Sequence, residues 1–102
     1  MSVDIKGKTA VITGASRGIG RASAIALAKE GVNVVLAARS LDELKVLANE
    51  IESTTGAKAL AVKADVSDEA DVNALKQMAL DAFGEVEILV NNAGITRDNL
   101  LM

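Results

Sequence analysis

The residues best suited to chemistry lie in a glycine-rich segment near the amino terminus. It reads Thr13-Gly14-Ala15-Ser16-Arg17-Gly18-Ile19-Gly20, and it joins the apolar run 10–12 to the helix-forming segment 21–29. A strand that turns through glycines into a helix directs several backbone N–H groups toward one point, at the positive end of the helix dipole. Such a point attracts negative charge, so the segment predicts a phosphate or pyrophosphate site.

The glycines follow the spacing G-x-x-x-G-x-G, with two more residues between the first pair than in the dinucleotide fingerprint G-x-G-x-x-G. The mechanical roles still apply. Gly14 would form the turn, Gly18 would allow close approach of the backbone, and Gly20 would let the helix pack on the strand. The alternative is a glycine-rich turn between strand and helix that binds no ligand, because glycines also mark ordinary turns.

Two arginines narrow the predicted ligand. In proteins that bind a dinucleotide without a 2′-phosphate, a carboxylate near the end of the second strand binds the ribose 2′-hydroxyl. Here that region carries Arg39, and the nearest acid, Asp42, falls inside the next predicted helix. Arg39 and Arg17 would suit a 2′-phosphate through charge-assisted hydrogen bonds. We therefore expect NADP(H), the alternative being that both arginines are only solvated loop residues.

Two further segments follow predicted strands. Asp65 could accept a hydrogen bond from an adenine amino group while Val66 packs against the ring, or Asp65 could stabilise the turn into the next helix. The segment Asn91-Asn92-Ala93-Gly94 offers side-chain amides and a glycine close to a nucleotide ribose. Its alternative role is structural, with asparagine amides joining neighbouring strands.

The hydrophobic pattern predicts the elements that position these residues. Strands are expected over 9–13, 33–38, 59–64 and 87–90, and the helices between them should end at Gly31, Gly56 and Gly84. Ser40 and Glu43 form a capping-box pattern, and Ser67 is expected to cap the third helix. The predicted buried stripes are Leu44, Leu47, Ala48 and Ile51 on the second helix, and Val72, Leu75, Ala79 and Ala82 on the third.

Alternating strands and helices with short connections predict an α/β fold, a parallel sheet between helix layers. In such a sheet the ligand lies beyond the carboxyl ends of the strands. The glycine segment, Arg39, Asp65 and Asn92 should all meet at that edge.

Composition bounds the remaining possibilities. The chain of 102 residues suits one domain, and a net charge of −3 argues against general binding to nucleic acid or acidic membranes. The absence of cysteine excludes a disulfide framework and a thiolate metal site, and no metal site is expected. No run has the length of a signal peptide core or a membrane span, so a cytoplasmic location is expected.

Together, the segment Thr13–Gly20, the pair Asp65-Val66 and the segment Asn91–Gly94 resemble the amino-terminal half of a short-chain dehydrogenase/reductase. Within that family, Thr13–Gly20 and Asn91–Met102 are most similar to the 3-oxoacyl-[acyl-carrier-protein] reductases of fatty-acid biosynthesis. The resemblance implies a Rossmann-like, three-layer half-domain with four parallel strands in the order 3-2-1-4 and three helices. It also implies NADP(H) contacts at Gly14, Ala15, Ser16, Arg17, Gly18, Ile19, Gly20, Arg39, Asp65, Val66, Asn92, Ala93 and Gly94.

The same resemblance indicates what the chain lacks. The family reduces carbonyls with serine, tyrosine and lysine residues that lie beyond this region, and this sequence contains no tyrosine, histidine or cysteine. We expect residues 1–102 to form a single truncated cofactor-binding domain without catalytic residues, inactive alone, with affinity on the order of tens of micromolar to millimolar. Strand 87–90 would then be an apolar edge, which predicts a homodimer. The alternatives are a self-assembling scaffold without function, or a fragment active only with its complementary half.

Overall fold

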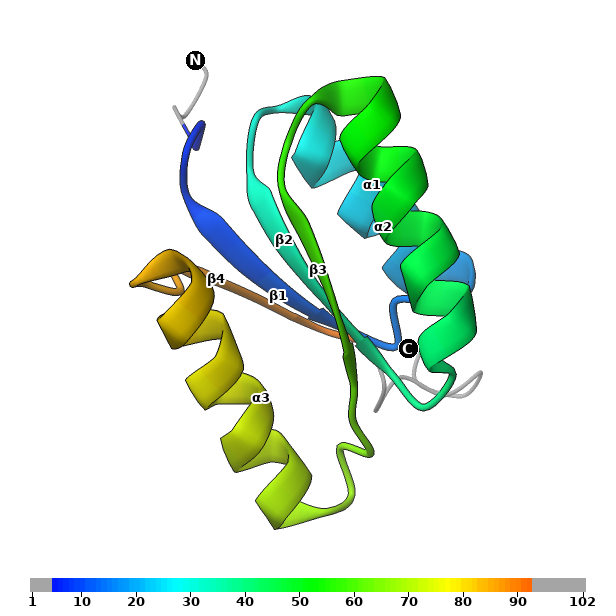
Figure 1. The fold of residues 1–102 in the computed structure, drawn as a ribbon, viewed down its shortest axis with the longest axis vertical. Coiled ribbons are helices and arrows are strands. Elements are labelled where there is room, and N and C mark those ends of the chain that lie inside the picture. The colour runs from blue at the N-terminus through cyan, green and yellow to red at the C-terminus, as the bar shows by residue number, and fades with distance from the viewer. Residues whose placement is uncertain (1–4, 93–102) are drawn as a thin grey trace, which may run out of the picture.

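The computed structural model describes residues 5–92. In chain order the elements are β1 (Thr9–Thr13), α1 (Gly18–Lys29), β2 (Asn33–Ala38), α2 (Leu41–Thr55), β3 (Ala59–Lys63), α3 (Glu69–Phe83) and β4 (Ile88–Asn91) (Figure 1). The strands predicted at 9–13 and 33–38 are confirmed, and the other two differ by one residue at one or both ends. α1 begins earlier than predicted, because Gly18 and Gly20 belong to its first turn.

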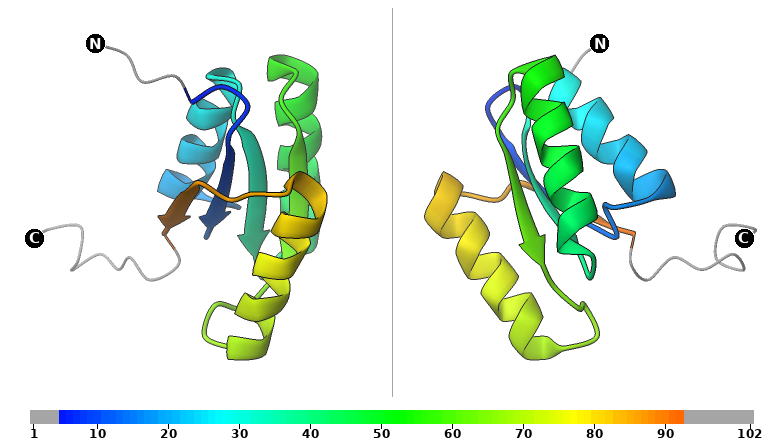
Figure 2. Two further views of the ribbon diagram at one scale, coloured as in Figure 1. Left: turned by 90° about the vertical axis from the view of Figure 1, so that its left-hand side faces the viewer. Right: turned by 45° about the vertical axis from the view of Figure 1, so that its right-hand side comes forward.

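The four strands form one parallel sheet in the order β3-β2-β1-β4, which confirms the predicted α/β, Rossmann-like half. β1 lies in the middle, so that Val11 is level with Val35 of β2 on one side and Leu89 of β4 on the other. Helices α1 and α2 cover one face of the sheet and α3 covers the opposite face (Figure 2). The fold therefore has the three layers that the sequence predicts.

Alternation along the strands divides the core between the two faces. Ala10 and Ile12 of β1 pack into the larger cluster, together with the buried stripe of α2. Val11, between them, points to the other face and belongs to the cluster that includes α3. Because successive side chains of a strand point in opposite directions, one short apolar strand supplies both layers.

The four predicted core positions of α2 are all buried, but the stripe on α3 differs from the prediction. Leu75 and Ala79 are buried, whereas Val72 is only half-buried and Ala82 is exposed. Phe83 packs against this cluster instead. Leu75, Ala79 and Phe83 are spaced four residues apart, so the buried ridge follows the i, i+4 direction and not the i, i+3 step to Ala82.

The predicted cap of α3 is wrong by one residue. Asp68 is the N-cap, and its Oδ1 accepts a hydrogen bond of 2.9 Å from the N–H of Ala70. The hydroxyl and N–H of Ser67 both donate to Oδ1 of Asp65 instead, at 2.6 and 2.9 Å. Ser67 is thus held in the turn before the helix, and a carboxylate occupies the cap, where the helix dipole favours negative charge.

The capping box predicted for α2 does not form. Ser40 is the N-cap residue, but its side chain makes no capping hydrogen bond. The predicted ends of the three helices are confirmed, since Gly31, Gly56 and Gly84 all have positive φ angles. Within residues 5–92, no helix combines the length and apolar character needed to cross a membrane.

Candidate nucleotide site

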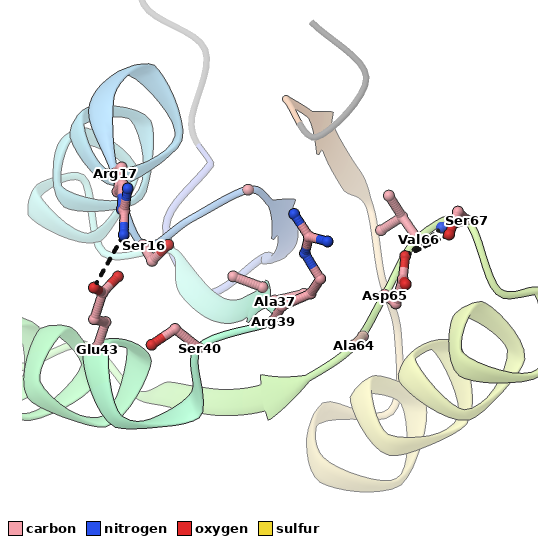
Figure 3. Close-up of a pocket in the computed structure, with 12 residues that line it drawn as sticks. Ser16, Arg17, Ala37, Arg39, Ser40, Glu43, Ala64, Asp65, Val66 and Ser67 are labelled. Atoms are coloured by element: carbon pink, nitrogen blue, oxygen red, sulfur yellow. Dashed lines mark hydrogen bonds and ion pairs between the residues drawn. The ribbon is translucent and has the colours of Figure 1, made fainter.

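The carboxyl ends of β1, β2 and β3 open onto a cavity of about 650 Å³ (Figure 3). Three segments far apart in sequence form its walls: the loop after β1, the loop after β2 with the start of α2, and the loop after β3. The lining residues are Gly14, Ser16, Arg17, Ala37, Ala38, Arg39, Ser40, Glu43, Ala64, Asp65, Val66 and Ser67. The fold therefore brings the glycine segment, Arg39 and the pair Asp65-Val66 together, as predicted.

The loop after β1 has a backbone conformation that requires glycine at two positions. Gly14 and Gly18 have φ angles of 61° and 54°, in the left-handed region that glycine adopts without steric cost. The N–H of Ala15 donates to the carbonyl oxygen of Ala37 at 3.1 Å, which fixes the loop against the end of β2. The turn predicted at Gly14 is therefore present, with a second left-handed residue where α1 begins.

Gly20 has a different role. A Cβ atom at this position would overlap the carbonyl oxygen of Gly14 and would lie 2.8 Å from its carbonyl carbon and 3.1 Å from the Cα of Ala15. Gly20 therefore lets α1 pack directly against the loop that leaves β1. This contact is the close packing of helix and strand that the third glycine of the segment predicts.

The start of α1 also has the electrostatics that suit an anion. Its first turn contains no acidic residue, whereas the first turns of α2 and α3 each contain two. The positive end of the α1 dipole therefore has no carboxylate of its own helix beside it. A phosphate group bound by the loop would supply the missing negative charge.

Asp65 takes part in the turn that the sequence offered as its alternative role. The two hydrogen bonds from Ser67 favour the charged carboxylate and lower its pKa below the ordinary 3.8, and the positive charge of Arg39 acts in the same direction. The backbone N–H of Asp65 donates to Oδ2 of Asp71 at 2.9 Å, so the loop is tied to α3. The turn role is shown, and Asp65 and Val66 both line the cavity.

The two arginines reach the cavity from different sides. Arg39 follows β2 and extends into the space between the loop after β1 and the loop after β3, while Arg17 extends from the start of α1 toward α2 (Figure 3). Nη2 of Arg17 lies 3.5 Å from Oε1 of Glu43. Sequence analysis missed Glu43 as a site residue because the capping-box pattern gave it a local role, and only the packing of α1 beside α2 shows its position.

The two asparagines at the end of β4 have different surroundings. The hydroxyl of Thr13 donates to Oδ1 of Asn91 at 2.9 Å, which confirms for this asparagine the alternative that its amide joins neighbouring strands. Nδ2 of Asn92 is buried, with no hydrogen-bond partner among residues 5–92. Ala93 and Gly94, also predicted to contact the cofactor, lie outside the described residues.

Similarity to known proteins agrees with this geometry. A model of the short chain dehydrogenase family matches residues 8–101. A 3-oxoacyl-[acyl-carrier-protein] reductase, FabG, of Staphylococcus aureus is 47% identical over 96 residues, which cover 93% of this chain and 39% of that protein.

Solved structures show the same relationship. L-sorbose reductase from Gluconobacter frateurii, complexed with NADPH and L-sorbose, superimposes with a TM-score of 0.88 at 44% identity, over 93% of this chain and 36% of that one. A short-chain dehydrogenase/reductase from Burkholderia phymatum in complex with NAD gives 0.81 at 41% identity, over 86% and 31%. The chain thus spans about two-fifths of the length of the Staphylococcus aureus reductase. It belongs to the short-chain dehydrogenase family and corresponds to the amino-terminal portion of the family fold.

Proposed function

We propose that this chain binds NADP(H) through the adenosine end of the cofactor and carries out no reduction by itself. The observation that carries the proposal is the cavity at the carboxyl ends of β1, β2 and β3, where a loop shaped for phosphate meets two arginines. Among the described residues, no other position combines a glycine loop and two arginines with the carboxyl ends of parallel strands, where ligands bind in sheets of this kind.

Each wall of the cavity suits one part of the cofactor. The loop 14–20 offers backbone N–H groups and the positive end of α1 to the pyrophosphate. Arg39 suits the 2′-phosphate, and Asp65 and Val66 suit the adenine. Asn92 is not among the residues that line the cavity, but it follows the neighbouring strand β4. Its buried, unpartnered amide nitrogen suits an acceptor on the ribose beyond the pyrophosphate, because a buried donor without a partner is costly. Ala93 and Gly94 complete that segment in the sequence.

The choice of cofactor depends on residues of this chain that differ between members of the family. The named relatives include a complex with NADPH and a complex with NAD, so family membership leaves the choice open. The segment that follows β2 begins with Arg39 and Ser40 and lacks the carboxylate that would bind a 2′-hydroxyl. An arginine at that position favours the phosphorylated cofactor.

The bound cofactor would supply hydride chemistry, and the protein's part would be restricted to binding and orientation. The sequence contains no tyrosine, the family's proton donor, nor a histidine or cysteine. We therefore propose that residues 1–102 act as one cofactor-binding half-domain. Its parent activity would be that of a carbonyl reductase similar to the 3-oxoacyl-[acyl-carrier-protein] reductases of fatty-acid biosynthesis.

The proposal is tested by calorimetric titration of the chain with NADP⁺, NAD⁺ and 2′,5′-ADP. We expect NADP⁺ and 2′,5′-ADP to bind more tightly than NAD⁺, and added salt to weaken the preference because it screens paired charges. Arg39→Ala should lower 2′,5′-ADP affinity about tenfold, the equivalent of roughly 1.4 kcal/mol for a charge-assisted bond at an accessible site. Lys45→Ala, which removes the same charge from the exposed side of α2, is the control. Equal losses in the two variants, or no binding of any nucleotide, would refute the assignment.

An apolar groove beside β4 is a candidate surface for binding a partner. Among residues 5–92, β4 pairs only with β1, and Leu89 on this strand is 67% exposed. A groove of about 490 Å³ lies between α3 and β4, with Leu75, Leu80, Val86 and Leu89 among its lining residues. Exposed apolar strand edges invite pairing, and a two-fold axis would let two copies cover the same surface on each other.

We propose a homodimer through this strand-four surface. The other candidate occupant is a helix from the complementary portion of the family fold, because a right-handed crossover from β4 would run over the face that carries α3. Sedimentation equilibrium of the isolated chain separates the two. A dimer at micromolar concentration that Leu89→Ser converts to a folded monomer supports the homodimer, and a folded wild-type monomer at that concentration contradicts it.

A further inference from the structure

The acidic residue in the cavity wall has a position that its place in the sequence does not suggest. Glu43 lies in the first turn of α2, lines the cavity beside Ser40, and contacts Arg17 across the gap between α1 and α2 (Figure 3). Its side chain is 44% exposed and that of Arg17 is 83% exposed. Both groups are therefore hydrated, and their separation of 3.5 Å makes a loose ion pair.

From this geometry we propose that Glu43 is a selectivity residue that opposes binding of a nucleotide 2′-phosphate. The inference rests on the proposed function, since it concerns the same cavity. Two effects act in the same direction. First, the carboxylate of Glu43 pairs with the guanidinium of Arg17, one of the two arginines that line the cavity. Second, this carboxylate places a negative charge in the wall of the cavity in which we propose that the doubly charged phosphate binds.

The ion pair is weak enough to be exchanged. Exposed pairs of this kind contribute little to folding because water and salt screen them. A phosphate carries more charge than a carboxylate and accepts hydrogen bonds at three oxygens, so it competes well for an arginine. Once Arg17 has turned to the phosphate, the carboxylate of Glu43 remains in the wall without its cation, and its repulsion of the ligand is then unbalanced.

Glu43 also has a structural role that any test must separate from selectivity. An acid in the first turn of a helix is favoured by the helix dipole, and Asp42 shares this role in α2. The chain provides a matched control in Glu50, which lies on the same helix and binds Arg21 of α1 at 2.8 Å. Glu50 is outside the cavity wall, so its replacement removes the same charge and the same kind of pair at a distance from the ligand.

The experiment is a calorimetric titration of the wild-type chain, Glu43→Gln and Glu50→Gln with 2′,5′-ADP and 5′-AMP at low ionic strength. We expect Glu43→Gln to raise 2′,5′-ADP affinity about three- to tenfold, from the release of Arg17 and the loss of repulsion, and to change 5′-AMP affinity by less than about twofold. Glu50→Gln should change both affinities by less than about twofold. The gain of Glu43→Gln should shrink in high salt.

The outcomes are distinguishable. If the wild type binds 2′,5′-ADP and Glu43→Gln leaves the ratio of the two affinities unchanged, the selectivity role is wrong while the proposed cofactor site stands. The same conclusion follows if Glu50→Gln produces an equal gain, because the effect would then come from net charge. If no variant binds either nucleotide, the proposed function fails, and the selectivity role fails with it.

Discussion

Gly20→Ala is the most direct test of how α1 packs on the nucleotide loop. The new Cβ would overlap the carbonyl oxygen of Gly14 and lie 2.8 Å from its carbonyl carbon, and both atoms belong to backbone that a hydrogen bond from Ala15 to Ala37 holds in place. Because no flexible side chain can move aside, either the loop or the helix has to shift.

The magnitude follows from two opposing effects. Overpacking of this kind costs about 1–3 kcal/mol, and exchanging glycine for alanine within a helix returns up to about 1 kcal/mol. We expect a net loss of roughly 1–2 kcal/mol. For a domain of this size that corresponds to a decrease in Tm of about 4–16 °C. Binding of 2′,5′-ADP should fall as well, since the displaced atoms form the phosphate loop.

Two other glycines serve as matched controls. Gly18 has a φ of 54°, but a Cβ atom added there would meet nothing within 4 Å, so Gly18→Ala tests backbone strain at the site without a steric clash. Gly56 has a φ of 78° and equally open surroundings at the end of α2, so Gly56→Ala tests the same strain far from the cavity. Both should lose about 1–2 kcal/mol, the cost of a left-handed residue with a side chain. Only Gly18→Ala should also weaken nucleotide binding.

The assay is thermal unfolding followed by circular dichroism, with calorimetric titration of 2′,5′-ADP on each folded variant. A Gly20→Ala protein that melts at or above the temperature of the wild type would show that α1 does not press against the loop, and the steric argument would be wrong. A loss of binding in Gly56→Ala equal to that in Gly18→Ala would show that the effect is global and not local to the site.

Two other predictions concern the turn after β3 and the pairing of β1 with β4. Since hydrogen bonds from Ser67 lower the pKa of Asp65, the stability that its carboxylate contributes is complete above pH 3.8 and is lost as the pH falls below that value through the folded-state pKa. Urea unfolding of wild type and Asp65→Ala should therefore show a stability difference that is constant near neutral pH and narrows in acid; a constant difference at all pH values would contradict this cause. Thr13→Val removes the hydroxyl that donates to Oδ1 of Asn91 and should cost about 1 kcal/mol, with faster amide hydrogen exchange in β4. Equal protection of β4 in both proteins would show that the bond does not hold β4 in place.

Much of the fold was predictable because local and long-range preferences agree. The apolar runs at β1 and β2 and the regular stripe on α2 are buried as their patterns predict, and the glycines at the helix ends adopt the predicted left-handed angles. The errors occur where two local solutions compete. Ser67 and Asp68 can both cap α3, and only the position of Asp65 decides that Ser67 serves the turn.

Some residues of the candidate site could be predicted from the sequence, and others could be found only in the structure. Gly14, Arg39 and Asp65 could be chosen from the sequence because residue type and position after a strand are both local properties, and parallel strands bring their carboxyl ends to one edge. The sequence alone also determines that the chain contains no tyrosine, histidine or cysteine for acid catalysis. Tertiary structure decided the rest. Glu43 faces Arg17 because α1 lies beside α2. The packing role of Gly20 was predicted from its spacing, but only the structure shows that its contact is the carbonyl group of Gly14. Contacts of this kind depend on how the helices pack on the sheet, and neither residue spacing nor composition specifies which side chains of two helices come within reach of each other.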